Sequence, residues 1–470
     1  MNYDVIIIGN TPVGRYAALT AALWEARVAL VTQEISVSAE ANWLYNFTLS
    51  QLTDIAEKWG NIQPLASQPT EIYQQWTAEV IAIIEEENAL EKLAARGVDV
   101  IAGKGEFCRL PQQALVVNQE TLTARGYLIA TETTPILPNV PNLSEIGYLT
   151  LTELREQQAL ERLPQTLTIV GESPTAISLA QNLARLNKTI TLAIAHPRLF
   201  PTEDRDLRSL VQAQLEADGI TLLKSSPLSG VKQMGDEKWL QLGNSAIATE
   251  ELILVPKTVP NLEGLNLEGV KVKPTENRLS LNEKLQTTNP SIYACGSVIG
   301  GYSFLNLGQY EAEIALKNIL FFPRYTVNYQ IIPCVMTTHP TFARVGMTEQ
   351  QARQQYGEKI VVLDLPFKDN LLPIVQSEMT GILKMIVHRK GHLLGAHSFG
   401  KNADLLVSFL AIAIAKKIKI KQLKTVSFPA PSLAELMAQA VRQWDRWYYQ
   451  NHPFWRELRK RYFLLRRNWK

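Results

Sequence analysis

The sequence predicts an α/β protein with two doubly wound domains followed by an α+β C-terminal domain. A strand–turn–helix–strand pattern occurs at residues 3–33 and again at residues 166–195. In both copies an apolar strand leads through a turn of small residues into a helix with apolar side chains every three or four positions. From about residue 331 the pattern changes to separate strands and a helix that starts near Ala403, which is typical of an α+β domain.

The two copies read "YDVIIIGNTPVGRYAALTAALWEARVALVTQ" and "TLTIVGESPTAISLAQNLARLNKTITLAIA". Two such Rossmann-like units predict two doubly wound domains, each able to bind a nucleotide beyond the ends of its strands. We expect four parts along the chain. They are a first domain with a central segment at 1–148 and 275–330, a second domain at 149–274, a third at 331–445 and a basic aromatic tail at 446–470.

Length and composition are those of an ordinary globular protein. The chain has 470 residues, of which 46% are hydrophobic and 20% charged. The longest apolar stretch is interrupted by Lys416 and Lys417 before it reaches the ~20 residues that a membrane span needs. No basic segment precedes the first strand, so we expect no signal peptide and a cytoplasmic protein. Cys108, Cys295 and Cys334 and the six histidines show no ligand spacing, so we expect no metal site.

Four short segments follow one another around the two nucleotide-binding patterns: "GVDVIAGKGEF", "LPNVP", "IYACGSVIGG" and "FARVGMTEQQA". With them, the chain to about residue 445 resembles the FAD- and pyridine-nucleotide-dependent disulfide oxidoreductases, which include dihydrolipoamide dehydrogenase, glutathione reductase and mercuric reductase. The resemblance implies that 1–148 with 275–330 is an FAD domain, 149–274 an NAD(P) domain and 331–445 a dimer-interface domain. It therefore implies a homodimer.

The resemblance also implies a redox-active disulfide, which this sequence lacks. In that family hydride passes from the nicotinamide to the flavin and then to a C-x4-C disulfide, which a serine–lysine pair follows. The matching segment "NWLYNFTLSQL" has Asn42 and Phe47 at the cysteine positions and Gln51 at the lysine position. Because no cysteine precedes Cys108, we expect no thiol relay in this chain.

Two further catalytic positions of the family differ. Ser178 stands where the family has the glutamate that pairs with the lysine. Loss of one partner of a buried ion pair would cost about 3–5 kcal/mol, whereas loss of both is tolerable. Ala430 replaces the histidine of the H-P-T-x-S-E motif, and we interpret the remaining Glu435 as a carboxylate at a helix start. We therefore assign no catalytic residue.

Seven residues of the first domain are candidates for binding FAD. Gly9 and Gly14 fit the tight turn and close helix packing of a dinucleotide loop, but Thr11 adds a Cβ where the family has a middle glycine. Pro12 lacks an N–H but lies at the helix start, where that loss costs least, and the helix N-terminus still favours an anion. The candidates are Gly9, Thr11, Pro12, Gly14, Thr32, Thr131 and Ser297.

Three replacements weaken the match to an FAD site. Thr32 takes the place of the ribose-binding acid, and Ser297 takes that of an aspartate that resembles the anchor of the flavin's ribityl chain. Glu132 replaces the glycine that should follow Thr131 in the family's A-T-G segment. An FAD site with unusual contacts and an empty nucleotide fold therefore both remain open.

The second loop, "GESPTA", departs further from the pattern. The candidate residues for NAD(P) are Gly171, Ser173 and Ala176, of which the last two occupy glycine positions. Ile194 stands where an acid would bind the NAD ribose, and His196 and Arg198 either reach a 2′-phosphate or only form a turn. We therefore favour NAD(P) less than FAD.

The final segment, "RQWDRWYYQNHPFWRELRKRYFLLRRNWK", combines aromatic and basic side chains. An apolar stripe with 3–4 spacing predicts a helix over 454–469. The stripe is Trp455, Leu458, Tyr462, Leu465 and Trp469. Residues 454–470 carry seven Lys or Arg and one Glu, a net charge of +6. This composition fits an anionic membrane surface and packing on protein about equally. A protein partner, or packing on the subunit or its dimer mate, is the alternative, and we expect no nucleic-acid binding.

Two functions remain open from the sequence. The first is a homodimeric flavoprotein that has lost dithiol–disulfide chemistry and, if active, uses FAD to transfer electrons from NAD(P)H to a non-thiol acceptor. The second is a catalytically inactive scaffold or regulatory protein that docks through its C-terminal tail. We expect a cytoplasmic location, at a membrane surface if the tail binds lipid.

Overall fold

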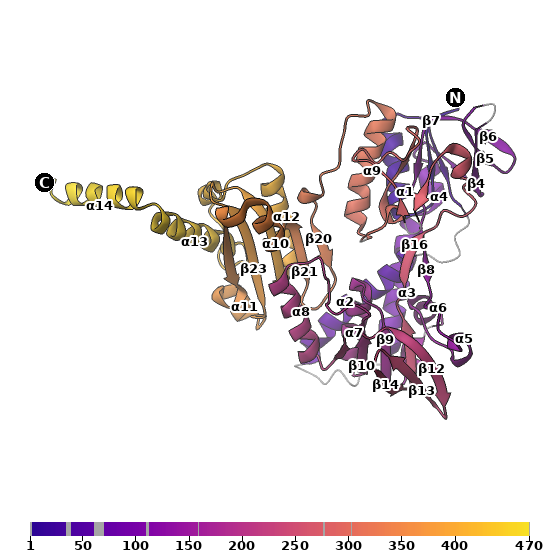
Figure 1. Ribbon diagram of the computed structural model, residues 1–470, viewed down its shortest axis with the longest axis horizontal. Coiled ribbons are helices and arrows are strands. Elements are labelled where there is room, and N and C mark those ends of the chain that lie inside the picture. Colours follow the sequence, from indigo (N-terminus) through magenta and orange to yellow (C-terminus); the bar gives the residue numbers. More distant parts are fainter. Residues whose placement is uncertain are drawn as a thin grey trace. The chain divides into compact units, whose positions relative to one another are not determined.

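The computed structural model describes residues 2–33, 39–60, 70–109, 112–157, 159–275, 278–301 and 303–469. The chain forms two compact units (Figure 1). Unit 1 comprises Met1–Phe200 and Leu215–Asn328, and unit 2 comprises Pro201–Gln214 and Tyr329–Lys470.

The first sheet of unit 1 has five parallel strands in the order β19-β7-β1-β2-β3. Their bounds are Ile292–Ala294, Ala124–Ile129, Tyr3–Ile8, Val28–Val31 and Val98–Ile101. Both faces are covered, as the nearly continuous apolar sequence of β1 and β2 requires. Helices α1 (Pro12–Leu23) and α9 (Leu305–Leu320) pack together on one face. The antiparallel strands β4 (Gly105–Cys108), β5 (Ala114–Val117) and β6 (Glu120–Leu122) supply core residues to the other face.

The second sheet of unit 1 has four parallel strands in the order β11-β10-β9-β15. Their bounds are Thr221–Leu223, Thr189–Ala193, Thr166–Val170 and Glu251–Leu254. Helix α7 (Pro174–Arg185) follows β9 directly. An antiparallel sheet shares a hydrophobic core with β10 and β15. It is formed by β12 (Leu228–Met234), β13 (Glu237–Leu242) and β14 (Ser245–Thr249).

Two long helices, α2 (Ala39–Gly60) and α3 (Thr70–Glu87), lie between the two sheets in sequence. Helix α2 packs against α7 and so connects the two doubly wound parts of unit 1. Strands β8 (Thr133–Ile136) and β16 (Lys257–Pro260) pair as an antiparallel ribbon that also joins them.

Unit 2 is built on a five-stranded antiparallel sheet in the order β20-β21-β24-β23-β22. The strand bounds are Cys334–Met336, Phe342–Gly346, Leu393–Gly400, Gly381–His388 and Ile360–Pro366. Helices α12 (Ala403–Ala415) and α13 (Glu435–Asn451) share the main core with one face of the sheet, and α10 (Glu349–Tyr356) packs with a smaller cluster. The predicted combination of two doubly wound domains with an α+β C-terminal domain is thus confirmed.

The C-terminal segment divides into two helices. Helix α13 is anchored by Trp444, which is 1% exposed within the core of unit 2, and it runs across the predicted start of the tail at residue 446. Helix α14 (Pro453–Arg467) extends away from the sheet of unit 2 and has no buried residue (Figure 1). The helix predicted over 454–469 is therefore present, and its stripe is not packed on the described part of its own subunit. Among the described residues no helix is long and apolar enough to cross a membrane.

Candidate functional site

The candidate residues of the first domain gather at one edge of the five-stranded sheet. Gly9 follows β1, Thr32 follows β2, Thr131 follows β7 by two residues and Ser297 follows β19 by three. These strands are parallel, so their carboxyl ends meet at the same edge. Strands β2 and β7 lie on opposite sides of β1, and ligands of open α/β sheets bind in the crevice at such a reversal of strand order.

Thr11 is part of the fold rather than an obstruction at the loop surface. Its Oγ1 accepts a hydrogen bond from the N–H of Gly14 at 3.0 Å and donates one to the carbonyl of Ala130 at 2.8 Å. The residue is 5% exposed and forms the N-cap of α1. From the sequence we expected its Cβ to crowd an approaching pyrophosphate, whereas the structure shows its hydroxyl bonded inward.

Gly9 and Gly14 are both required by close backbone contacts. Gly9 has φ +119°, and a Cβ there would lie 2.4 Å from the carbonyl oxygen of Ala130. A Cβ on Gly14 would lie 2.1 Å from the carbonyl oxygen of Gly9. Pro12 is the first residue of α1, where its missing N–H costs least. The turn from β1 into α1 is therefore that of a dinucleotide loop.

The other first-domain candidates are buried or half-buried. Thr131 is 6% exposed and its Oγ1 donates to the carbonyl of Asn261 at 2.8 Å. Thr32 is 9% exposed. Ser297 is half-buried in a 3₁₀ turn, and the preceding N–H, of Gly296, donates to a carboxylate oxygen of Glu311 at 2.8 Å. Sequence reasoning missed Glu311, a buried acid on α9 that fixes this turn.

The second loop has the same local form as the first. Ser173 is the N-cap of α7, and its Oγ accepts from the N–H of Ala176 at 3.2 Å. A Cβ on Gly171 would lie 2.6 Å from the carbonyl oxygen of Val255. Ala176 is fully buried. These three candidates therefore shape the turn from β9 into α7.

A charged side chain that the sequence reasoning did not single out occupies this second loop. Glu172 forms an ion pair with Lys257 at 2.6 Å and accepts a hydrogen bond from the N–H of His196 at 3.1 Å. Burial acts to raise the pKa of Glu172, but Lys257 and His196 outweigh it and the pKa lies below its ordinary value. Ile194 is fully buried. The imidazole Nδ1 of His196 accepts a hydrogen bond from the N–H of Arg198 at 3.1 Å, which fits the alternative that these two residues only form a turn.

Helix α2 contains the segment that the resemblance equates with the redox-active disulfide, and its side chains make other contacts. On α2, Asn42 donates through Nδ2 to the hydroxyl of Thr152 at 2.9 Å. Phe47 stacks on Trp43 with ring centroids 5.3 Å apart and an interplanar angle of 5°. Gln51 is exposed. At the positions that the resemblance equates with the cysteines, Asn42 therefore makes an amide contact and Phe47 an aromatic stack.

The contact between α2 and α7 is made by a pair of asparagines. Asn182 donates through Nδ2 to Oδ1 of Asn46 at 3.0 Å, and both residues are at most 2% exposed. Ser178 is fully buried on α7, and its hydroxyl has no hydrogen-bond partner among the described residues. Asn182 lies one helical turn after Ser178, so helical spacing from this position could have located it. Gln51 and Ser178 are not brought together.

Comparison with known proteins identifies the family. The profile described as pyridine nucleotide-disulphide oxidoreductase matches residues 3–315, and that of the dimerisation domain of the same family matches residues 332–441. The chain belongs to the pyridine nucleotide-disulphide oxidoreductase family. It is 29% identical to mercuric reductase of Staphylococcus aureus over 78% of this chain and 67% of that protein. It is 28% identical to dihydrolipoyl dehydrogenase of Bacillus subtilis (strain 168) over 73% of this chain and 75% of that protein.

Solved structures confirm the fold of this oxidoreductase family. LpdA (Rv3303c) from Mycobacterium tuberculosis has a TM-score of 0.84 at 21% identity, covering 93% of this chain and 99% of that one. The HOCl-induced flavoprotein disulfide reductase RclA from Escherichia coli has a TM-score of 0.81 at 22% identity, covering 94% and 99%. Members of the family use FAD and NAD(P), and this supports FAD as a cofactor of this chain. NAD(P) has less weight because the second loop departs further from the dinucleotide-binding pattern. The dimerisation domain supports a homodimer.

Ala430 stands at the position that the resemblance equates with the histidine of the interface motif. Ala430 is exposed. Glu435 is the first residue of α13, and its carboxylate accepts from the N–H of Ser432 at 3.2 Å. The prediction that Glu435 serves a helix start is confirmed.

The three cysteines are separate free thiols. Cys295 is fully buried and Cys334 is 8% exposed, and burial raises the pKa of both thiols. Cys108 ends β4. A raised pKa keeps a thiol protonated and unreactive, so neither buried cysteine has the properties of a catalytic thiolate. Among the described residues no cluster of His, Cys, Asp or Glu could hold a metal ion.

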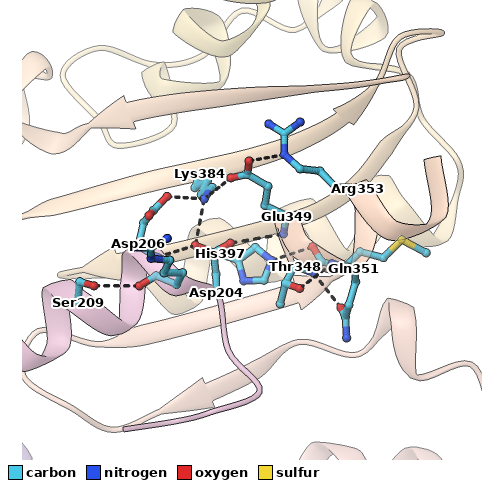
Figure 2. A network of polar contacts seen from close by, with 11 residues as sticks. Asp204, Asp206, Ser209, Thr348, Glu349, Gln351, Arg353, Lys384 and His397 are labelled. Carbon is cyan, nitrogen blue, oxygen red and sulfur yellow. Dashed lines mark hydrogen bonds and ion pairs between the residues drawn. The ribbon is translucent and has the colours of Figure 1, made fainter. Parts of the chain in front are cut away.

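Unit 2 contains a buried charge cluster that the sequence did not indicate (Figure 2). Lys384, 2% exposed on β23, contacts carboxylate oxygens of Asp204 at 3.1 Å, Asp206 at 2.6 Å and Glu349 at 2.7 Å. Burial acts to lower the pKa of Lys384, but the three acids raise it above its ordinary value. The imidazole Nε2 of His397 lies 2.9 Å from the carbonyl oxygen of Met347, and burial lowers the pKa of His397 to about 4. The cluster ties the start of α8 (Arg205–Ala217) to the sheet of unit 2.

Proposed function

We propose that this chain is a homodimeric FAD protein that moves electrons without dithiol chemistry. It accepts them from NAD(P)H or another donor and passes them from the flavin to a non-thiol acceptor. The observation that carries the proposal is the replacement of both redox cysteines by Asn42 and Phe47 in a chain whose first cysteine is Cys108. Family membership supplies the flavin part of the proposal.

The turn from β1 into α1 is suited to the pyrophosphate of FAD. Gly9 and Gly14 allow the backbone to approach closely, and the first N–H groups of a helix have no partners inside it. The side chain of Thr11 points away from the loop surface because its hydroxyl donates a hydrogen bond to the carbonyl of Ala130. We assign the pyrophosphate to this turn, the adenosine side to Thr32 and the ribityl side to Ser297, with Thr131 supporting the loop. FAD, when bound, supplies the two-electron acceptor that no side chain of this chain offers.

The stacked pair Phe47 and Trp43 supports a direct route for electrons. Trp43 is 43% exposed, so this helix presents an aromatic surface where its relatives have a redox disulfide. A planar non-thiol acceptor, such as a quinone or dye, can stack on aromatic rings. We therefore place the acceptor class among aromatic redox compounds rather than disulfides or mercuric ion.

The test is to purify the native chain and record its visible spectrum, then compare acceptors. Yellow protein whose flavin is reoxidised by quinones or dyes, and not by glutathione disulfide, lipoamide or mercuric ion, supports the proposal. NAD(P)H-dependent turnover of any of the last three above background contradicts it. A colourless protein contradicts it as well and favours the scaffold function, for which the buried Thr32 and Thr131 are the supporting observation.

We propose further that α14 docks the dimer on an anionic membrane surface. The stripe predicted from the sequence is open to solvent, with exposed fractions from 47% at Leu458 to 87% at Trp469. Among the described residues of α14, one ion pair is present, between Arg461 and Glu457 at 3.6 Å. Basic side chains beside an apolar stripe fit a surface of anionic lipid, where each Lys or Arg adds about 1 kcal/mol.

Liposome co-sedimentation tests this docking. The full chain is compared with a chain ending at His452, which keeps the core of α13 and the hydrogen-bonding contact between His452 and Tyr448. Binding to anionic vesicles that weakens with salt and is lost on truncation supports the proposal. A full chain that ignores the vesicles contradicts it. If truncation then breaks the dimer, the stripe belongs to the dimer interface, and if the dimer survives, a protein partner is the remaining alternative.

A further inference from the structure

The two dinucleotide-type loops of this chain are nearly identical in backbone and capping. Thr11 has φ −87° and ψ 164°, and Ser173 has φ −75° and ψ 159°. Each side-chain oxygen accepts the N–H three residues later, and each helix begins with proline. A dinucleotide would therefore meet the same helix dipole and the same loss of N–H donors at both sites.

The loops differ in charge at their second position. In the first loop this residue is Asn10, whose carbonyl and Oδ1 accept from the guanidinium of Arg15 at 3.0 and 3.4 Å. In the second loop it is Glu172, and the position equivalent to Arg15 is the fully buried Ile177. One loop therefore carries a neighbouring cation, and the other carries an anion.

The carboxylate of Glu172 is held in its loop from two sides. Lys257 contacts one oxygen at 2.6 Å and the N–H of His196 donates to the other at 3.1 Å. The side chain of Lys257 is 75% exposed, whereas that of Glu172 is 26% exposed. Water therefore screens the lysine charge more than the carboxylate charge. The end of β10 adds no compensating ligand, because Ile194 is buried where the first domain has Thr32.

We propose that Glu172 excludes pyrophosphate-bearing nucleotides from the second dinucleotide fold, so that the electron donor of this chain is not a nicotinamide dinucleotide bound there. Glu172 directly precedes Ser173, the N-cap of α7, so its carboxylate adds a negative charge to the loop that a pyrophosphate would approach and repels that anion. The inference rests on the proposed function in one respect only, because NAD(P)H is one of the electron donors which that function allows. The exclusion itself requires no bound flavin.

The test measures binding of NADH, NADPH and ADP-ribose to the full chain as purified, whatever its flavin content, by titration calorimetry. Glu172→Asn gives the second loop the residue of the first, and Glu172→Gln removes the charge at constant size. We expect no binding to the wild-type chain at micromolar concentrations and at least a tenfold gain in affinity for ADP-ribose in both variants, largest at low salt. Thermal unfolding verifies that each variant folds.

Two matched variants complete the design. Lys257→Met leaves Glu172 charged and unpaired, so it should show no gain in affinity. Asn10→Glu places the same charge in the first loop and should lower the flavin content of the purified chain by a similar factor. Micromolar NADH or NADPH binding by the wild-type chain, or unchanged affinity in Glu172→Asn and Glu172→Gln, would overturn the inference. Neither result bears on the flavin content or acceptor range on which the proposed function depends.

Discussion

Thr11 shows how a replaced residue can preserve a loop. The sequence places it at a position where a side chain should interfere with a cofactor, but its hydroxyl bonds Gly14 and Ala130 inside the protein. The bonding partner Ala130 is 119 residues away, so no local pattern could reveal this contact. The replacement therefore changes how the loop is held and leaves its turn intact.

Removing this hydroxyl should destabilise the protein. Thr11→Val keeps the shape but removes the N-cap bond and leaves the Ala130 carbonyl unpaired in a buried site, which costs about 1–3 kcal/mol of the free energy of unfolding. Urea unfolding measures the change. Thr11→Ser keeps the hydroxyl and is the control. A loss in Thr11→Ser with none in Thr11→Val would show that the methyl group, rather than the hydrogen bonds, matters.

His397 should make unit 2 sensitive to acid. Its folded-state pKa is lowered to about 4, and the unfolded value is about 6.5. Between these values the unfolded chain binds a proton that the folded chain does not, so stability falls as the pH drops from about 6.5 towards 4. By pH 4.5 the loss reaches about 2–3 kcal/mol.

The measurement is the urea midpoint at pH 7 and pH 4.5 for the wild-type chain and for His397→Gln, which can still donate to the Met347 carbonyl. The variant should lose less stability over this range. Asp204, Lys384 and Arg344 also act on the pKa of His397, so only the difference between the two proteins is informative. The same loss in both would contradict the assignment to His397.

Among the elements, α2 and α7 are joined by two buried amides, Asn46 and Asn182, which lie at other positions than the ion pair that the resemblance implies. Asn182→Leu leaves Asn46 without a buried partner and should lower the free energy of unfolding by about 1–3 kcal/mol. The double variant Asn46→Leu with Asn182→Leu should lose less than the sum of the single changes, because no amide is left unpaired. Strictly additive losses in a double-mutant cycle would show that the two side chains do not interact.

Elements were easier to predict than contacts. The apolar runs of β1 and β9, the turns at Gly9 and Gly171 and the stripe of α14 follow from local periodicity. The stripe alone could not say whether it is buried, because a helix facing a core and a helix facing lipid have the same spacing. The cluster around Lys384 could not be predicted either, since Asp204 and Asp206 lie 180 and 178 residues away.

For the molecule as a whole, the proposed function keeps the fold of the family and changes its chemistry. The chain keeps the two nucleotide folds and the dimerisation domain of its family. At the positions that the resemblance equates with the catalytic residues it has Asn42, Phe47, Ser178 and Ala430. In the structure, Asn42 bonds Thr152 and Phe47 stacks on Trp43. Family membership therefore predicts the cofactor and the dimer better than it predicts the substrate.

The proposed function requires flavin to be the sole redox group of this protein, and an anaerobic reductive titration can count the redox groups. Each bound FAD accepts two electrons, and a redox disulfide would accept two more. The purified chain, titrated with dithionite and followed by flavin absorbance, should be fully reduced by two electrons per flavin, with no new free thiols afterwards. Uptake of four electrons per flavin together with two new thiols, or the absence of any bound flavin, would contradict the claim.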